Sequence, residues 1–195
     1  MGVLRVALTA LACAASSSAL PNGSVASKQS SCIHHQGPAA ARGAEPYLEY
    51  TGFDISNVVV RENRERYGAD NPFFRFEQFD AVDRPLPHGR FDFIFCRHLM
   101  FHLTPQHSLR LMKRFEQSGA KYLMMTTYLR ADENEKDFVL AFGHRINLFR
   151  KPYCIRDPMR LYVDGEADMM LGLWQLSDDT GKVLPLLNWT SYCLE

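Results

Sequence analysis

The sequence predicts an α/β domain built around a doubly wound, mostly parallel β-sheet, and three observations carry this prediction. From Tyr47 onward, strand-like and helix-like segments alternate with the spacing of βαβ units. The run from Phe91 to Cys96 is almost continuously apolar, which is typical of a parallel strand covered on both faces. Ser56 and the pair Thr104-Pro105 are helix-start signals that stand between predicted strands.

Each predicted strand is a short aromatic or apolar run, and each helix lies between a capping residue and a glycine. The predicted strands are 47–53, 73–79, 91–96, 121–128, 159–163 and 169–176, and the predicted helices are 57–67 and 105–117. Gly68 is the expected end of the first helix, and Ser118-Gly119 ends the second. The last two strands are separated by Asp164-Gly165-Glu166, and 138–143 is expected to form a short turn or helix.

The composition argues against several classes of function. The 195 residues include 22 basic and 22 acidic side chains, so no basic field is available for a phosphate backbone and nucleic-acid binding is not expected. The five cysteines contain no CxxC pair, which argues against a structural zinc site. The N-terminal apolar run is shorter than the roughly 20 residues that cross a bilayer, so no membrane span is expected.

The first 45 residues differ in kind from the rest of the chain. Glu45 is the first acidic residue, and the apolar run Val6 to Ala15 has the length of a signal-peptide core. Three interpretations stay open: a secretory signal, an organellar transit peptide, or an aberrant start of the gene product. A secretory signal or a transit peptide would direct the protein to the secretory route or to an organelle. Without either signal, a cytoplasmic location is expected. We expect a low-complexity segment over 1–45, of which 1–30 packs poorly, and a folded domain over 46–195.

Two acidic residues follow neighbouring predicted strands, where ligands of open α/β sheets bind. Asp54 ends the first of these strands, and its carboxylate could accept both hydroxyl hydrogens of a ribose. Asp80 ends the next strand and could accept from an adenine amino group, while the following backbone amide donates to a ring nitrogen. The alternatives are that Asp54 only favours a helix start and that Asp80 only caps a turn.

The third strand end delivers Cys96, Arg97 and His98 to the same edge of the sheet. His98 is a candidate general base or hydrogen-bond partner of a substrate. The alternative for Arg97 is an ion pair with a nearby carboxylate, and His102 is expected to be a packing residue. A nucleophilic role for Cys96 is not favoured, because nothing in the sequence marks a lowered thiol pKa.

With these residues in place, the chain from about Tyr47 to Leu176 resembles the class I S-adenosylmethionine-dependent methyltransferases. The likeness rests on an ordered set of short motifs. They are Gly52-Phe53-Asp54-Ile55, Cys96-Arg97 with His102-Leu103, Ser118-Gly119-Ala120-Lys121-Tyr122-Leu123, Arg145-Ile146-Asn147-Leu148, Lys151-Pro152-Tyr153, Asp157-Pro158 and Leu171-Gly172-Leu173-Trp174. The resemblance implies a Rossmann-like seven-stranded sheet and S-adenosyl-L-methionine as cofactor.

The resemblance also assigns roles to residues. Asp54 and Ile55 would bind the cofactor ribose, Asp80 and Ala81 the adenine, and Cys96 would complete the cofactor site. Arg97 and His98 would face the methyl group and an acceptor, either a small molecule or a protein. No metal is implied.

The family's first strand and the glycine loop that follows it are not recognisable upstream of Asp54. The segment 31–41 stands where they are expected, with Cys32-Ile33 as a remnant strand and Gly37 as a remnant turn. We therefore expect a weak or missing first strand. The alternative function is a catalytically inactive methyltransferase-fold binding module or a truncated gene product. A nicotinamide-dependent oxidoreductase would need GxGxxG upstream of Asp54, which is absent.

Overall fold

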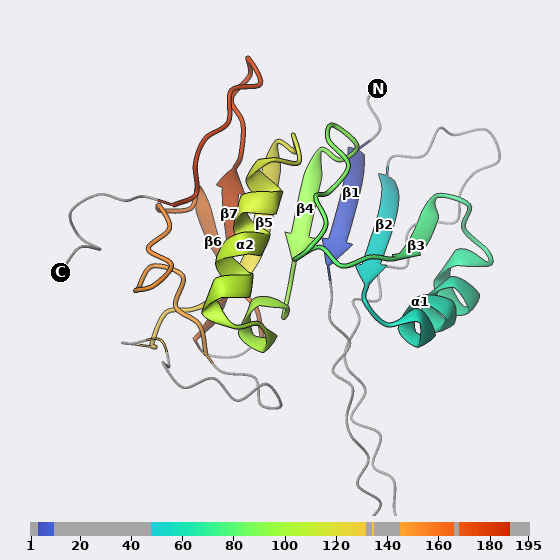
Figure 1. The fold of residues 1–195 in the computed structure, drawn as a ribbon, viewed down its shortest axis with the longest axis horizontal. Coiled ribbons are helices and arrows are strands. Elements are labelled where there is room, and N and C mark those ends of the chain that lie inside the picture. The colour runs from blue at the N-terminus through green and yellow to red at the C-terminus, as the bar shows by residue number, and fades with distance from the viewer. Residues whose placement is uncertain (1–3, 10–47, 132–133, 135–144, 166–167, 188–195) are drawn as a thin grey trace, which may run out of the picture.

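Seven strands form one sheet in the order β3-β2-β1-β4-β5-β7-β6 (Figure 1). The computed structural model describes residues 4–9, 48–131, 134, 145–165 and 168–187. The strands are β1 (Leu4–Thr9), β2 (Leu48–Asp54), β3 (Phe74–Gln78), β4 (Phe93–Cys96), β5 (Tyr122–Tyr128), β6 (Arg160–Val163) and β7 (Met169–Gln175). The helices are α1 (Asn57–Asn63), a π-helical turn (Arg64–Gly68), a 3₁₀ turn (Met100–His102) and α2 (Pro105–Glu116).

This architecture confirms the α/β class and the mostly parallel sheet. Neighbouring strands from β3 through β5 are parallel, β7 is antiparallel to β5, and β6 is antiparallel to β7. Every predicted strand from β2 onward begins and ends within two residues of its expected bounds. The predicted turn or helix at 138–143 lies outside the described residues. Strand order reverses between β1 and β4, which makes that point of the sheet the expected ligand crevice.

The expectation of a weak or missing first strand is wrong. β1 pairs with β2 from Leu4↔Leu48 to Thr9↔Phe53 and with β4 from Val6↔Phe93 to Leu8↔Phe95. Residues 4–9 therefore form the centre of the sheet, whereas 1–30 were expected to pack poorly. A short apolar run fits a buried strand as well as a signal-peptide core, and its periodicity does not distinguish the two. The segment 31–41, in which the sequence predicted a remnant of the first strand, lies outside the described residues.

The predicted helix starts are confirmed. The Ser56 hydroxyl accepts a hydrogen bond from the Val59 amide, so Ser56 is the N-cap of α1. Thr104 caps α2 by accepting from the His107 amide, and Pro105 is the first helical residue. α1 is shorter than predicted because the chain passes into the π-helical turn at Arg64.

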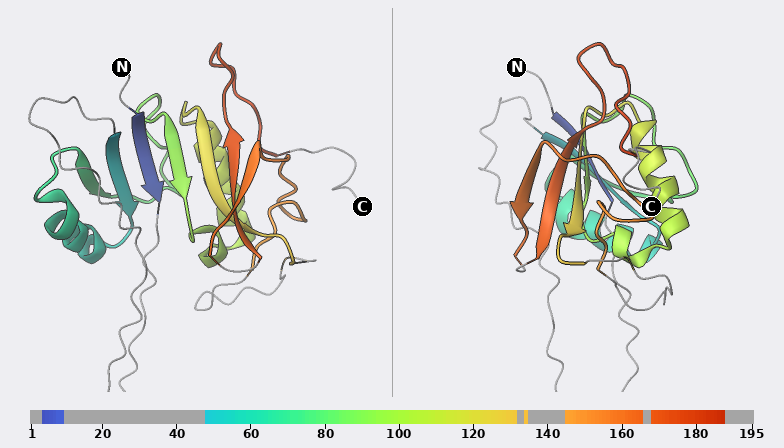
Figure 2. Two further views of the ribbon diagram at one scale, coloured as in Figure 1. Left: turned by 180° about the vertical axis from the view of Figure 1, so that it is seen from behind. Right: turned by 90° about the vertical axis from the view of Figure 1, so that its left-hand side faces the viewer.

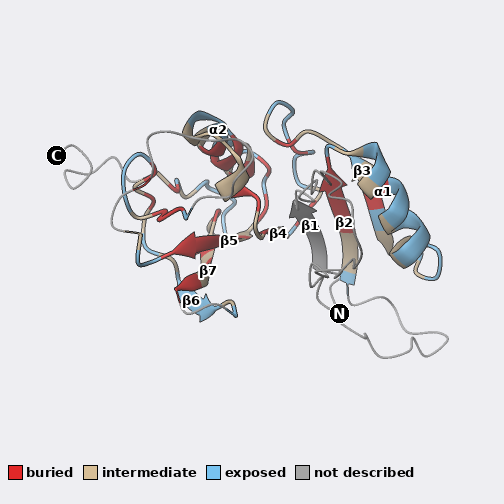
Figure 3. Ribbon diagram, turned by 90° about the horizontal axis from the view of Figure 1, so that it is seen from below, coloured by how far each residue is buried: buried red, intermediate tan, exposed pale blue. Residues whose placement is uncertain are grey.

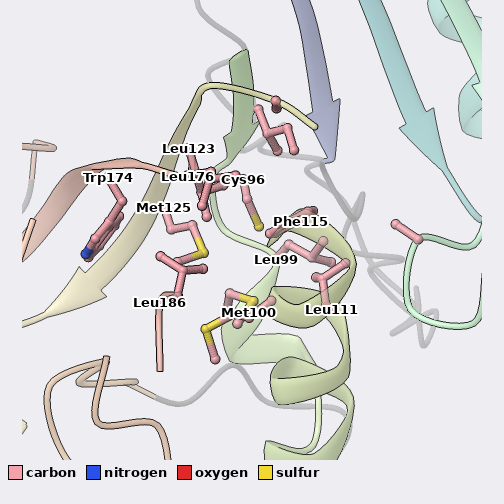
Figure 4. Close-up of a cluster of buried hydrophobic side chains, with 14 of the residues drawn as sticks. Cys96, Leu99, Met100, Leu111, Phe115, Leu123, Met125, Trp174, Leu176 and Leu186 are labelled. Carbon is pink, nitrogen blue, oxygen red and sulfur yellow. The ribbon is translucent and has the colours of Figure 1, made fainter. Parts of the chain in front are cut away.

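The core lies between α2 and one face of the middle strands. α2 contributes Leu111, Met112 and Phe115, which are buried in one cluster with Ile94 of β4 and Leu123 of β5 (Figure 4). Figure 2 shows α2 on a single face of the sheet. Burial is concentrated in β5 and α2, whereas β6 and much of α1 are exposed (Figure 3). This packing fixes the strand ends that carry the candidate site.

Within the described part of the chain, no helix has the length and apolar character needed to cross a membrane.

Replacing Ala7 by proline tests whether β1 holds the sheet together. Ala7 pairs with Thr51 on one side and Ile94 on the other, and proline removes its amide donor. We expect Ala7→Pro to lower the free energy of unfolding by at least about 1–3 kcal/mol, the cost of an unpaired buried carbonyl. Urea unfolding followed by circular dichroism measures this, with Ala7→Ser, which keeps the amide donor, as control. Equal stability of wild type and Ala7→Pro would contradict the central role of β1.

Candidate functional site

A pocket of about 160 Å³ opens at the carboxyl ends of β2 and β3. Its walls come from the ends of these two strands, the loop after β3, the segment after β4 and the first turn of α2. The lining residues are Phe53, Asp54, Ile55, Phe79, Asp80, Ala81, Val82, Asp83, Leu99, Leu103 and His107. Four of the five residues predicted to bind the cofactor therefore lie on one cavity.

Asp54 is the last residue of β2 and lies in the pocket wall with only 8% of its surface exposed. Its Oδ1 accepts a hydrogen bond of 2.7 Å from the Ser56 amide, at the start of α1. The helix-start interpretation of Asp54 is thus confirmed as one of its roles. Each carboxylate oxygen has two lone pairs, so the bond to Ser56 leaves Oδ1 with capacity to accept from a ligand.

Asp80 and Ala81 form the part of the pocket next to β3. Asp80 Oδ1 accepts from the amides of Val82 and Asp83 at 2.9 and 3.1 Å, which confirms the turn-capping alternative for this oxygen. In the described ranges, Asp80 Oδ2 and the Ala81 amide make no hydrogen bond. An acceptor and a donor are therefore adjacent and unpaired there, on the wall of the pocket.

Most of the remaining pocket wall is apolar. Ile55 lines the pocket and has 53% of its surface exposed. Leu99 and Leu103 close the side nearest β4, and His107 comes from the first turn of α2. Sequence reasoning missed these last three residues. Their position around the N-terminus of the helix that follows β4 was the available signal.

Cys96, the fifth predicted cofactor residue, is the last residue of β4 and is completely buried in the core beneath α2 (Figure 4). Its thiol does not line the pocket. The alternation of side chains along a strand explains this, because Cys96 shares the inward face with Ile94. The role predicted for Cys96 can therefore be filled only by its backbone.

Arg97 and His98 follow β4 and lie outside the pocket lining. The Arg97 guanidinium forms a two-point ion pair with Asp164, at 2.8 Å from Nε to Oδ2 and 3.1 Å from Nη2 to Oδ1. This confirms the ion-pair alternative for Arg97. His98 has a left-handed backbone (φ 57°), and its amide donates to Thr126 Oγ1 of β5 at 3.1 Å.

His102 lies in the 3₁₀ turn after β4. Its ring packs against Phe101, with 4.3 Å between ring centroids, as expected of a packing residue.

Sequence reasoning also missed Asp164, which it treated only as part of a strand separator. β6 is antiparallel to β7 and β7 to β5, so the carboxyl end of β6 lies at the same sheet edge as that of β5. Applying the strand-end rule to β6 would have found Asp164. Among the described residues, no group of three or more His, Cys, Asp or Glu side chains could hold a metal ion.

Removing the Arg97 guanidinium should destabilise the domain measurably. The side chains of Arg97 and Asp164 are only 23% and 14% exposed, so Arg97→Gln leaves a largely buried carboxylate without its partner. We expect a loss of about 1–3 kcal/mol in the free energy of unfolding. Arg110→Gln is the matched control, because its ion pair with Asp83 is exposed and such pairs contribute about 0–1 kcal/mol. Chemical denaturation measures the free energy of unfolding of both variants. Equal losses would show that the Arg97–Asp164 pair stabilises the domain no more than the exposed Arg110–Asp83 pair does.

Residues 35–124 match the family model described as "Methyltransferase domain". The match covers a little under half of the chain and includes the ends of β2, β3 and β4. It therefore contains every residue predicted for the cofactor and acceptor sites. No curated protein matches the chain significantly.

Solved structures with a similar fold include three methyltransferases. The mitomycin 7-O-methyltransferase MmcR is 15% identical with a TM-score of 0.52, and the match covers 66% of this chain and 42% of that one. The TehB-like SAM-dependent methyltransferase from Corynebacterium glutamicum is 11% identical with a TM-score of 0.45, covering 66% and 68%. The DszA carbon methyltransferase is 21% identical with a TM-score of 0.37, covering 43% and 22%.

At 15% identity, the similarity to MmcR shows a likeness of fold alone, and the matches cover less than half the length of MmcR and of the DszA enzyme. The family match agrees with the seven-stranded, Rossmann-like sheet and its strand-end pocket. The chain thus has the Rossmann-like fold of the class I methyltransferases, and its residues 35–124 are similar to the methyltransferase-domain family.

Proposed function

We propose that this domain binds S-adenosylmethionine in the strand-end pocket and transfers its methyl group to an acceptor at the adjoining end of β4. The observation that carries the proposal is the gathering of Asp54, Asp80 and Ala81 on one pocket at the carboxyl ends of β2 and β3. When bound, the cofactor would supply an activated methyl carbon on a sulfonium.

The ribose would be held by Asp54. A carboxylate matches the two hydroxyl hydrogens of a vicinal diol, and hydrogen bonds to a charged acceptor are stronger than neutral ones. Asp54 is nearly buried and tied to the Ser56 amide, so its position is set before any ligand arrives. Little ordering entropy would then be lost on binding.

The adenine would lie against Asp80 and Ala81. An adenine edge presents an amino donor beside a ring-nitrogen acceptor, and the pocket offers Asp80 Oδ2 and the Ala81 amide as the complementary acceptor and donor. Ile55, Leu99 and Leu103 supply apolar surface for the faces of the base. Polar groups at one side and apolar walls around them are typical of pockets for small ligands.

His98 is our candidate for the base that accepts a proton from the acceptor, and Arg97 borders the same space. Both follow β4, the strand on the opposite side of β1 from β2. Methyl transfer is an in-line displacement, so orienting the acceptor and removing its proton are the main tasks left to the protein. The acceptor would be a small molecule or a protein.

A second candidate function is a methyltransferase-fold binding module without turnover. The observation that favours it is the sequence after β1, in which the first glycine is Gly23. Glycine lets backbone approach a ligand closely, and other residues place a Cβ there. Binding of S-adenosylhomocysteine without methyl transfer to any acceptor would distinguish this module from the enzyme.

We also propose that the N-terminal apolar run serves as β1 rather than as a cleaved targeting signal. The pairing of Leu4–Thr9 with two strands supports this, since cleavage near Ala19 would remove the strand. An N-terminal sequence of the cellular protein that begins after Ala19 would contradict it.

Calorimetric titration with S-adenosylhomocysteine tests the pocket. Asp54→Ala should weaken binding about 10- to 100-fold, because charge-assisted hydrogen bonds contribute about 1.5–3 kcal/mol. Asp54→Asn should lose less, since it keeps an oxygen that accepts from Ser56, and His98→Ala should leave affinity nearly unchanged. Asp70→Ala, an exposed acid outside the pocket lining, is the control.

Unchanged affinity in Asp54→Ala would show that this residue only starts a helix. No detectable heat from folded wild-type protein at millimolar ligand would overturn the proposed function.

A further inference from the structure

One carboxylate, that of Asp164, faces both residues assigned to the acceptor side. It lies at the end of β6, where its amide donates to Met169 across the turn into β7. Oδ2 is 2.8 Å from Arg97 Nε and 3.9 Å from Nε2 of His98. The His98 side chain is 38% exposed, whereas that of Asp164 is only 14% exposed. The Asp164 carboxylate is therefore the more buried member of this set of three side chains, and the His98 imidazole is the more exposed one.

A thioether also lies against the His98 ring. Nε2 lies 3.0 Å from the sulfur of Met169, which is nearly buried and also accepts from the Tyr128 hydroxyl at 3.3 Å. Of the described groups, this thioether and the Asp164 carboxylate lie within 4 Å of Nε2, and both are acceptors. These two contacts favour the tautomer with the proton on Nε2.

The backbone of His98 holds the ring in this place. A positive φ is uncommon for a residue with a side chain and persists only where the surroundings enforce it. Here the amide of His98 is bound to Thr126 on β5, and the preceding residue is held by Asp164 from β6. Two neighbouring elements thus fix residues 97 and 98 at the end of β4.

We propose that Asp164 is a positioning residue for methyl transfer, which anchors Arg97 and serves as the counter-ion of protonated His98. The inference rests on the proposed function in assigning His98 as the base. The proton leaving the acceptor moves to the imidazole of His98 as the methyl group takes its place on the acceptor, with S-adenosylhomocysteine as the leaving group. The ring then carries a positive charge on an imidazole whose Nε2 is 3.9 Å from Asp164 Oδ2. Stabilising the charged ring makes His98 a stronger base.

The charged groups around His98 come from three elements. Arg97 follows β4, Asp164 follows β6, and the pair Arg145–Asp168 lies between β5 and β7, with Arg145 over the Tyr128 ring. Among the described residues, Asp164 is a carboxylate within 4 Å of the imidazole, and Asp168 forms an ion pair with Arg145 at 2.9 Å. Asp168 is thus a matched control: a buried, arginine-bound acid on the same side of the sheet edge.

The test follows the protonation of His98 by NMR of the full chain with labelled histidine, and the spectrum of His98→Gln assigns its signal. Asp164→Asn should lower the pH at which His98 becomes protonated by about half to one unit. Arg97→Gln should raise that pH, because it removes a positive charge and frees the carboxylate. Asp168→Asn should shift it by less than half as much as Asp164→Asn. Opposite shifts from the two partners of one ion pair would not arise from a merely structural role.

The proposal is overturned if Asp164→Asn leaves the protonation of His98 unchanged, or if Asp168→Asn has an equal effect. If Asp164→Asn does not fold, Arg97→Gln decides alone, and a shift to lower pH overturns the proposal. S-adenosylhomocysteine affinity, measured in parallel, should stay within about threefold of wild type in Asp164→Asn, since Asp164 does not line the pocket. Lack of binding by wild type would overturn the proposed function while the protonation result still stands.

Discussion

The pairing of β1 with both β2 and β4 is the interaction on which the rest of the structure depends. Leu4–Thr9 joins a half-sheet that ends in β3 to one that ends in β6. Without this strand, β2 and β4 would each present an unpaired backbone edge, and the halves would have no fixed relation. Asp54 and Arg97 belong to one sheet edge because six residues of backbone hold their strands in register.

The two halves contribute different chemistry to that edge. β2 and β3 bring the acids and the free amide of the pocket, whereas β4, β5 and the β6–β7 turn bring an ion pair, a histidine and a thioether. Each group is anchored within its own half: Asp54 to Ser56, and Arg97 to Asp164. The division follows from the reversal of strand order at β1, which leaves the crevice between halves that are built independently.

The sequence predicted those elements whose local signals and tertiary roles agree. Ser56 and Thr104 cap the helices they were expected to cap, and the strand ends at Asp54, Asp80 and Arg97 meet at one edge. β1 was missed because an apolar run beside an Ala/Ser-rich stretch fits two interpretations that composition cannot separate. The partner of Arg97 was missed because it lies 67 residues away, and only the pairing of β6 through β7 brings it near.

Both pocket acids also serve local structure. Asp54 receives the Ser56 amide, and Asp80 receives two amides of the following turn. Selection for folding alone would therefore retain both aspartates in a descendant that no longer transferred methyl groups. The presence of both aspartates in a homologous sequence would therefore indicate a stable fold as much as activity. His98 caps no helix, and its strained backbone would relax if glycine replaced it. Under the proposed function, loss of this histidine is thus the change by which an inactive lineage would first be distinguished from an active one.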